Sequence, residues 1–528
     1  MKKSVGIAVG LVVAVGAAST AGAWYTGNQL EQLLNTSIIE ANQDLKALLP
    51  GTGITPTIEL IALERGFFTS TARYRVKASG NLHTTGEDST PVDGELLFVD
   101  HIEHGPFPLS RVLGLKLLPV MAKSNFELEN SPTVEKWFVA SKGLSPLTGD
   151  TSVGYNRDVS GSVHLQPLDY SEERGSVKFS GLALDLAITD DKRSVRVDGN
   201  MDSLVFSAPD STRIEFSDLS LGSDSERGES GLYLGSSESS LKLIQVQLPE
   251  QEPLLIKDML QKSQLDEGKD GVFGSFTYDV GMISYAGKDV GALKLGGSMK
   301  NLDTASLKSL TDLYKELLTK LDAASYDAGQ PDFNLTPEQE TKLKADIGTL
   351  LAGKPVLALD TFAFKTAHGE SRFNFALGLN KPASFELPPQ ELLMQAIGSL
   401  DARLVVSKPM IKDVILNKAA LDPSADPAMV AQEAEQMAEM AGMMAVGTQL
   451  ATVDGNDIVA SVKYAEGQVD LNGRKMPVEE FAGMVMAMAG GMGGAPAGDV
   501  DLSDLEGLDA PAAEAEAEAE AEAEADVE

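Results

Sequence analysis

At residues 182–189 the sequence runs Leu-Ala-Leu-Asp-Leu-Ala-Ile-Thr, and the charged turn Asp190-Asp191-Lys192 follows. Large apolar side chains occupy every second position, which is the period of a strand with one buried face. The same alternation occurs at 276–282 and at 373–379. Between residues 155 and 302 such runs recur, separated by clusters of Gly, Ser, Asn and Asp. The sequence therefore predicts consecutive antiparallel strands that share one apolar face.

Two of these runs change phase partway along the strand. The apolar positions are Ile214, Phe216, Leu219 and Leu221 in one run, and Leu241, Leu243, Ile244, Val246 and Leu248 in the other. A change of phase moves the apolar side chains to the other face unless the backbone is irregular at that point. It therefore predicts a bulge, or a strand that bends from one layer to another.

Helical spacing interrupts the strands in two regions, at about 303–353 and about 388–450. In the first region leucines recur at helical spacing from Leu307 to Leu321, and Thr336-Pro337 is typical of a capped helix start. We expect these two helices to pack on the sheet as a hairpin. Further helices are expected at 390–399, 410–418, 427–450 and 478–489, with a β-hairpin at 457–471. The predicted fold class is α+β and predominantly antiparallel β, a long curved or layered sheet with packed helices.

Residues 1–27 form a cytoplasmic stub and a transmembrane anchor in our prediction. Lys2 and Lys3 precede an uncharged run from Ser4 to Tyr25, which at 1.5 Å per residue is long enough to cross ~30 Å of hydrocarbon. The lysines place the short end in the cytoplasm and export the remainder to the periplasm. The predicted anchor residues are Ser4, Val5, Ile7, Val9, Leu11, Val12, Val13, Val15, Trp24 and Tyr25. The alternative is a signal peptide cleaved after Ala21-Gly22-Ala23, which exports the same remainder.

The rest of the chain divides into a helix, a β-rich region and a tail. Residues 28–50 are expected to form a stalk helix, because Leu30, Leu34, Ile38 and Leu45 share one helical face before Pro50-Gly51. Residues 51–489 are the β-rich periplasmic region. Residues 490–528 end in Ala-Glu repeats, which we interpret as a disordered, acidic, solvating tail rather than a binding arm.

Composition disfavours several functional classes. The formal net charge is −35, and a chain this acidic repels phosphate backbones, so we expect no nucleic-acid partner. The chain has no cysteine. Thiol nucleophiles, disulfides, thiolate zinc sites, iron–sulfur clusters and lipid acylation of a cysteine are therefore excluded.

No catalytic, cofactor-binding or metal-binding residue can be assigned from the sequence. His101 and His104 are three apart in an apparent strand, where they point to opposite faces, so a structural role is favoured over metal binding. Neither a Gly-x-Ser-x-Gly elbow nor a phosphate-binding loop is present. Asp and Glu are too numerous for any pair to be informative, so a hydrolase that uses two carboxylates stays open as an alternative.

Methionines cluster on the helix expected at 427–450, at positions 429, 437, 440, 443 and 444. Our preferred interpretation is a helix packed on the sheet. Methionine-rich helix faces also serve adaptable binding, so a face for a lipid or a partner protein is the alternative.

Several short motifs, spread in order along the chain, resemble the YdgA family of bacterial proteins. They include Arg65-Gly66-Phe67-Phe68, His104-Gly105-Pro106-Phe107-Pro108, Leu165-Gln166-Pro167-Leu168 and Leu471-Asn472-Gly473. The resemblance implies an inner-membrane protein that faces the periplasm, in a family with no established activity and a loose association with surface motility. It transfers no catalytic residue. The glycines of the motifs are interpreted as turns, the prolines as fixed bends and the aromatic residues as part of the core.

Three functional hypotheses follow from this sequence. The first is a non-enzymatic envelope protein that binds lipid or another apolar ligand along its sheet, as the layout resembles AsmA-like lipid-carrying proteins. The second is an anchored adaptor or scaffold in an envelope or motility complex, and the third is a carboxylate-based hydrolase. A lipid binder needs an uncovered apolar trough, an adaptor a closed core with an outer apolar patch, and a hydrolase a pocket of converging carboxylates.

Overall fold

The computed structural model describes residues 30–48, 54–66, 68–83, 89–104, 108–116, 118–156, 158–189, 193–320, 335–421 and 424–491. The predicted anchor, the four motif residues Phe67, Gly105, Pro106 and Phe107, and the tail from residue 492 lie outside these ranges. No helix within the described ranges is long and apolar enough to cross a membrane.

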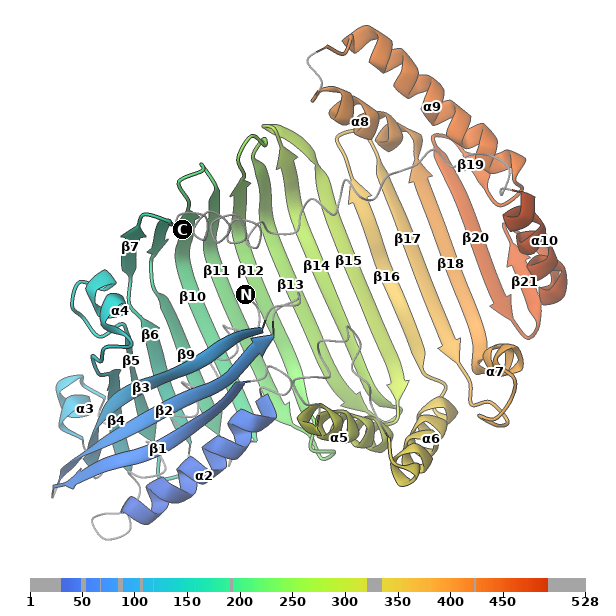
Figure 1. The fold of residues 1–528 in the computed structure, drawn as a ribbon. Coiled ribbons are helices and arrows are strands. Elements are labelled where there is room, and N and C mark those ends of the chain that lie inside the picture. Colours follow the sequence, from blue (N-terminus) through green and yellow to red (C-terminus); the bar gives the residue numbers. More distant parts are fainter. Residues whose placement is uncertain are drawn as a thin grey trace, which may run out of the picture.

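A single antiparallel sheet of 22 strands runs through the described chain (Figure 1). The strands are β1 (Ile54–Arg65), β2 (Thr69–His83), β3 (Ser89–His104), β4 (Ala122–Leu128), β5 (Leu147–Val153), β6 (Val159–Leu165), β7 (Leu168–Glu172), β8 (Gly175–Phe179), β9 (Leu182–Thr189), β10 (Ser194–Ser207), β11 (Arg213–Arg227), β12 (Tyr233–Gln247), β13 (Leu254–Gly268), β14 (Gly271–Tyr285), β15 (Lys288–Leu302), β16 (Val356–Lys365), β17 (Glu370–Leu379), β18 (Ile397–Ser407), β19 (Thr452–Asp454), β20 (Asp457–Ala465), β21 (Gln468–Leu471) and β22 (Arg474–Pro477).

The strands pair in chain order, with one detour. Consecutive strands are neighbours from β1 to β6 and from β9 to β18. The hairpin β7–β8 instead attaches to the end of β10, and β6 pairs directly with β9. At the far end of the sheet β20 pairs with β18, β19 and β21, and β21 pairs with the last strand, β22. The predicted antiparallel β architecture is therefore confirmed.

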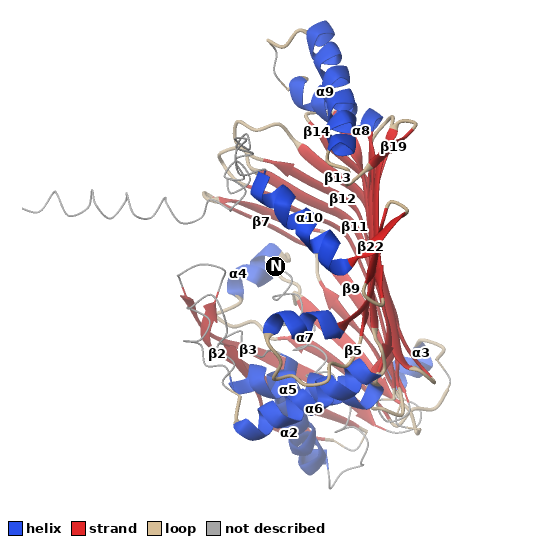
Figure 2. Ribbon diagram, turned by 90° about the vertical axis from the view of Figure 1, so that its right-hand side faces the viewer, coloured by secondary structure: helices blue, strands red, loops and turns tan. Residues whose placement is uncertain are grey.

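Nine helices accompany the described strands. They are α2 (Leu30–Leu48), α3 (Leu109–Leu113), α4 (Glu135–Ala140), α5 (Thr304–Lys320), α6 (Pro337–Ala352), α7 (Pro389–Ala396), α8 (Lys408–Ala419), α9 (Pro427–Gly447) and α10 (Val478–Gly491). The sheet is curved, and α2, α5, α6, α7 and α10 lie on its concave side (Figure 2). The helices α8 and α9 project from the end of the strands that is opposite to α5 and α6 (Figure 1).

The main core lies where the first strands curl around α2. Leu34, Ile38 and Leu45 of α2 are buried against Tyr74 and Phe98 of β2 and β3. An amphipathic helix of this length gains most of its stability from such packing rather than from propensity. Within the predicted range 28–50 the structure has a helix at Leu30–Leu48, and because its apolar face belongs to the core, it does not stand free as a stalk.

The predicted helical regions are confirmed in part. The start of α6 carries the expected cap, with Thr336 and Gln339 bonding each other's backbone N–H groups. The second region is not continuous, because β18 separates α7 from α8. The predicted helix at 390–399 ends at Ala396, since Leu400, Ala402 and Leu404 follow the period of a strand.

The two changes of phase coincide with irregular backbone in adjacent strands. Asp218 in β11 and Asp258 in β13 adopt φ values of +53°, and the pairing of both strands with β12 is interrupted at this row, which contains Lys242. Because neighbouring strands are irregular at the same row, the pairing continues on both sides of it. Irregular backbone at this row agrees with the predicted bulge or bend.

The preferred interpretation of the methionine-rich helix is confirmed only in part, because α9 lies against a strand of the sheet but its methionines do not form the packed face. The face of α9 that packs is made of Ala434, Ala438 and Gly442, which lie against α8 and the edge strand β19. Residues with small side chains, spaced four apart, let two helices approach closely. The methionines lie on the opposite face and are exposed, with Met429 and Met443 at 70% and 69%.

Candidate functional site

The two faces of the sheet carry different side chains. Ion pairs link neighbouring strands on one face, such as Lys262 with Glu238 at 3.0 Å and Lys294 with Asp279 at 3.3 Å. Successive side chains of a strand point to opposite faces, so Ser263 and Leu293 belong to the other face. That face is the concave one, because the row that contains Ser263 ends at Val462, which packs with α10.

One row of register partners crosses the middle of the concave face. We call it the central row, and its members on β11 to β17 are Ser223, Ser237, Ser263, Phe276, Gly297, Leu359 and Phe375. Three serines stand at one end and apolar side chains at the other. The row is therefore amphipathic across the strands, although each strand alone alternates in the usual way.

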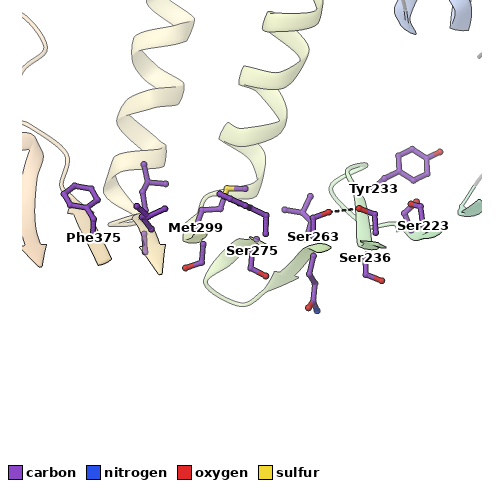
Figure 3. Close-up of a pocket in the computed structure, with 18 residues that line it drawn as sticks. Ser223, Tyr233, Ser236, Ser263, Ser275, Met299 and Phe375 are labelled. Carbon is purple, nitrogen blue, oxygen red and sulfur yellow. Dashed lines mark hydrogen bonds between the residues drawn. The ribbon is translucent and has the colours of Figure 1, made fainter. Parts of the chain in front are cut away.

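An open cavity of about 640 Å³ lies along the central row, and we call it the groove. Its volume falls within the range of ~300–1,000 Å³ that is usual for small-molecule sites. Figure 3 shows Met299 and Phe375 toward one end and Ser223 and Tyr233 at the other. Among the described residues that line the groove there is no Asp, Glu, Lys or Arg.

The apolar end of the groove leaves large side chains uncovered. Phe276, Met299 and Leu357 remain 38%, 37% and 41% exposed although they belong to the concave face. Phe362 and Leu404 continue this surface beyond the groove with similar exposure. A contiguous apolar patch on a concave surface marks a binding site more often than isolated exposed side chains do.

A glycine sets the floor of the groove beneath Phe276. A Cβ on Gly297 would lie 2.7 Å from the ring of Phe276, so no larger residue fits while the ring keeps its place. The ring also contacts Tyr278 edge to face, with centroids 5.8 Å apart. Glycine thus allows an aromatic ring to lie flat across the neighbouring strand.

The serine end offers hydroxyl groups to a polar ligand. Ser237 Oγ and Ser263 Oγ are 2.7 Å apart, and Ser239 Oγ donates to Gln261 Oε1 at 3.1 Å. Each hydroxyl has one donor and two acceptor positions, so these mutual bonds leave capacity for a ligand. The groove can therefore hold an apolar chain at one end and hydrogen-bond a polar group at the other.

A second cavity, of about 330 Å³, lies on the charged face. Asp150, Asp185 and Asp198 line it and are register neighbours through Ser162. Asp150 accepts a hydrogen bond from Ser162 Oγ at 2.7 Å and pairs with Lys123 at 3.3 Å. This cavity therefore holds carboxylates of the kind that the hydrolase hypothesis requires, and so does a third cavity of about 570 Å³ that Glu229, Glu267 and Asp312 line.

A histidine and an aspartate meet at the end of β16. His368 Nδ1 lies 2.7 Å from Asp413 Oδ1, and Asp413 Oδ2 accepts from the Thr366 hydroxyl and the His368 amide at 2.5 and 2.9 Å. Burial tends to raise the pKa of Asp413, but these hydrogen bonds outweigh it and hold the pKa below its ordinary value. The arrangement fastens the β16–β17 turn to α8.

Polar groups also lie inside the main core. Tyr74 and Asp100 are both fully buried, and Asp100 Oδ1 accepts a hydrogen bond from Ser124 Oγ at 2.6 Å. Burial, and next to it the negative charge of Asp100, raise the pKa of Tyr74 well above its ordinary value. These groups are far from solvent and belong to the packing of β2, β3 and β4.

The motif residues within the described ranges occupy turns of the backbone. Gly66 sits where a Cβ would lie 2.3 Å from the carbonyl of Thr69, and Arg65 ends β1 beside it. Asn472 and Gly473 have φ values of +53° and +88° in the β21–β22 turn. This agrees with the interpretation of these motif residues as turns. The motif aromatic Phe68, in contrast, is 70% exposed at the β1–β2 turn, so its interpretation as a core residue is wrong.

The remaining motif residues, and the histidine pair, lie around the start of α3. Pro108 precedes α3 and is buried. His104 Nε2 lies 2.9 Å from Ser70 Oγ, whereas His101 Nδ1 lies 3.4 Å from Thr71 Oγ1. The two histidines therefore meet different residues of β2.

Comparison with known proteins places the chain in a family. Residues 1–479 match the family described as bacterial protein of unknown function (DUF945). The chain belongs to this family. Protein YdgA of Escherichia coli is 28% identical over 495 residues, which cover 92% of this chain and 97% of YdgA. The resemblance to the YdgA family is thereby confirmed, and the function of the DUF945 family is unknown.

Two further relatives are uncharacterized proteins. YihF of Escherichia coli is 21% identical over 483 residues, which cover 90% of this chain and 97% of YihF. A protein of Haemophilus influenzae is 27% identical over 183 residues, which cover 34% of this chain and 46% of the relative. Their names assign no activity to any residue of this DUF945 chain.

The sequence patterns predicted the apolar end of the groove but not its serine end. The alternation at 276–282 and 373–379 marked Phe276 and Phe375 as apolar-face residues, and both line the groove. The serines were missed, because Ser237 and Ser263 are 26 residues apart and only the strand register brings them together. Serines at every second position of neighbouring strands were the available signal.

Proposed function

We propose that this protein is a non-enzymatic, membrane-anchored protein of the periplasm that binds a lipid in the groove. The acyl chain would lie along Phe276, Met299 and Leu357, and the polar head over the serines of β11 to β13. The observation that carries the proposal is the central row, which changes from serines to apolar side chains within one cavity. The length of that row suits an elongated amphipathic ligand rather than a compact polar one.

The energetics favour an acyl chain at the apolar end. Each methylene group removed from water contributes ~0.8 kcal/mol, so several buried methylenes outweigh the loss of freedom on binding. The lining has no charged side chain among the described residues, which avoids the cost of leaving a charge without water. An adaptor with a closed core would not need this uncovered trough.

The location in the envelope rests on the N-terminal sequence. The uncharged run from Ser4 to Tyr25, behind Lys2 and Lys3, supports an uncleaved anchor and export of the remainder. A protein anchored in the inner membrane would have lipids at hand as ligands. The partners in this proposal are the inner membrane and a lipid.

The test is native purification of the full-length protein in mild detergent, followed by mass spectrometry of the intact complex and of extracted lipids. The decisive variant is Phe276→Glu, which places a carboxylate in the path of the chain. Its matched control is Phe273→Glu on the opposite face of the same strand, where the side chain is 44% exposed against 38% for Phe276.

We expect stoichiometric lipid on the wild-type protein and on Phe273→Glu, and little on Phe276→Glu. Lipid that is absent from the wild type, or equal on both variants, contradicts the groove proposal. The same spectra test the anchor: a chain that begins near Met1 supports it, whereas a chain that begins at Trp24 indicates a cleaved signal peptide.

A second candidate, an adaptor role, is favoured by α9. Its five methionines are exposed, and three of them, Met440, Met443 and Met444, lie within one turn and a half. Such a flexible apolar face suits a partner protein. This role would be favoured if an envelope protein co-purifies with the wild type but not with the Met440→Glu, Met444→Glu double variant. Bound lipid should be retained in that variant.

A further inference from the structure

An exposed apolar surface surrounds α3, on the connection between β3 and β4. Leu109, Leu113, Leu115 and Leu118 are 68%, 76%, 83% and 79% exposed. Phe68, at the β1–β2 turn, is 70% exposed, and its carbonyl accepts a hydrogen bond from the His104 amide just before this connection. Four leucines and a phenylalanine at one end of the sheet far exceed the scattered apolar residues of an ordinary surface.

The connection is held in place by its own hydrogen bonds. The Pro108 carbonyl accepts from the amides of Arg111 and Val112, and the Ser110 amide donates to Glu103 Oε2 at 3.0 Å. The Arg111 guanidinium donates to Ser152 Oγ at 3.3 Å and to the Leu118 carbonyl at 3.2 Å. These bonds fasten both ends of the connection to the sheet, so the leucines are displayed outward rather than collapsed onto the core.

The charge of this segment differs from that of the chain as a whole. Between His104 and Phe126 the sequence has Arg111, Lys116 and Lys123 and no Asp or Glu, although the net charge of the protein is −35. Arg111 and Lys116 also face the three aspartates of the second cavity, so the surface behind the leucines is close to balanced. This end of the molecule can therefore approach an anionic surface that the rest of the chain would repel.

We infer that the α3 surface, made of Leu109, Leu113, Leu115, Leu118 and Phe68, inserts into the interfacial region of a bilayer that contains anionic lipid. Aliphatic side chains enter the boundary between head groups and acyl chains, and Lys116 lies at the level of the head groups, as in other interfacial segments. A bilayer fits better than a protein partner, because four of the five exposed apolar residues are leucines and the neighbouring charged residue is a lysine, a type that is depleted at protein interfaces. The inference does not depend on the groove.

The absence of cysteine makes the test direct, because one introduced cysteine is the only site of labelling. Full-length Leu113→Cys carries an environment-sensitive fluorophore and is reconstituted in vesicles of equal parts phosphatidylglycerol and phosphatidylcholine. The matched control is Met429→Cys on α9, an apolar position of similar exposure at the opposite end of the strands. Nitroxide groups on the upper acyl chains serve as quenchers.

We expect a blue shift and strong quenching at position 113 and neither at position 429. Lys116→Glu in the Leu113→Cys background should lower the quenching several-fold, whereas Lys269→Glu, an equal change of charge on the exposed β13–β14 turn, should leave it unchanged. Absence of quenching at 113, equal quenching at 113 and 429, or equal effects of the two lysine variants overturns the inference. Quenching at 429 alone would assign membrane contact to α9 instead.

Discussion

The ring of Phe276 on β14 lies over Gly297 on β15, its partner in the register, and a Cβ on Gly297 would come within 2.7 Å of the ring. Real Cβ atoms are essentially never found this close to another heavy atom. The ring and the glycine therefore depend on each other: the ring keeps its place only while position 297 has no side chain. Because Phe276 lines the groove, this pair links the local packing to the proposed ligand site.

Gly297→Ala should weaken lipid binding while leaving the fold intact. The new methyl group displaces the Phe276 ring into the groove, and an overpacking effect of ~1–3 kcal/mol corresponds to a loss of affinity of about fivefold to 150-fold. The control is Gly296→Ala, whose Cβ would meet Thr277 at 3.5 Å on the other face, an ordinary contact. Displacement of a fluorescent fatty acid measures both affinities. Equal affinities would show that the ring is not part of the ligand site.

Affinity should rise with the length of the acyl chain. Each methylene buried in the groove contributes ~0.8 kcal/mol, so each added carbon should tighten binding about fourfold until the apolar end is full. A titration series of saturated fatty acids measures this increment. Affinity that is independent of chain length would contradict the assignment of Phe276, Met299 and Leu357 to the chain, because an apolar wall responds to apolar area.

Strand positions could be predicted because alternation is a local property. Residues 182–189 form β9 with Leu184 buried, and Thr336 with Gln339 caps α6 as the sequence indicated. The order of the strands could not be predicted, because the detour of β7–β8 to the end of β10 depends on pairing between residues far apart in the chain. The interruption by β18 was missed for a similar reason, since its short alternation lies between two strong helical patterns.

The site was predictable only on its apolar side. Phe276 and Phe375 follow the period of a strand, so the sequence of each strand alone assigns them to the apolar face of the sheet. The serines of the central row look like ordinary polar positions in each separate strand, and only the register places Ser237 beside Ser263 and Phe276. The anchor at 4–25 lies outside the described residues and stays a prediction.

The attachment of α8 to the β16–β17 turn should weaken in acid. The pKa of Asp413 in the folded protein lies below its ordinary value, so its stabilising effect is present above that ordinary value and is lost as the pH falls through the lowered one. Hydrogen bonds to a charged group contribute about 1.5–3 kcal/mol each, so Asp413→Asn should destabilise by about 2 kcal/mol at pH 7 and flatten the acid dependence.

Thermal unfolding of both proteins from neutral pH down to about pH 3 measures this effect. The control is Asp401→Asn, which breaks the exposed ion pair with Lys463 and should change stability by less than ~1 kcal/mol. Hydrogen exchange at the His368 amide gives a local readout, because that N–H donates to Asp413. An acid dependence that persists unchanged in Asp413→Asn would assign it to other carboxylates.

Asn472 should contribute more to the stability of the fold than its place in a short turn indicates. Its Oδ1 accepts from the Ser461 amide at 2.7 Å, and its Nδ2 donates to the Leu450 carbonyl at 2.9 Å, so one side chain ties β20 to the segment that follows α9. Asn472→Gly keeps the positive φ and removes both hydrogen bonds, at a cost of about 1–3 kcal/mol. Asn472→Ala should cost about 1 kcal/mol more, because a residue with a Cβ is strained at this φ. Hydrogen exchange across β20 and β21 measures the two effects separately, and equal protection in the glycine variant and the wild type would show that the side-chain bonds contribute nothing.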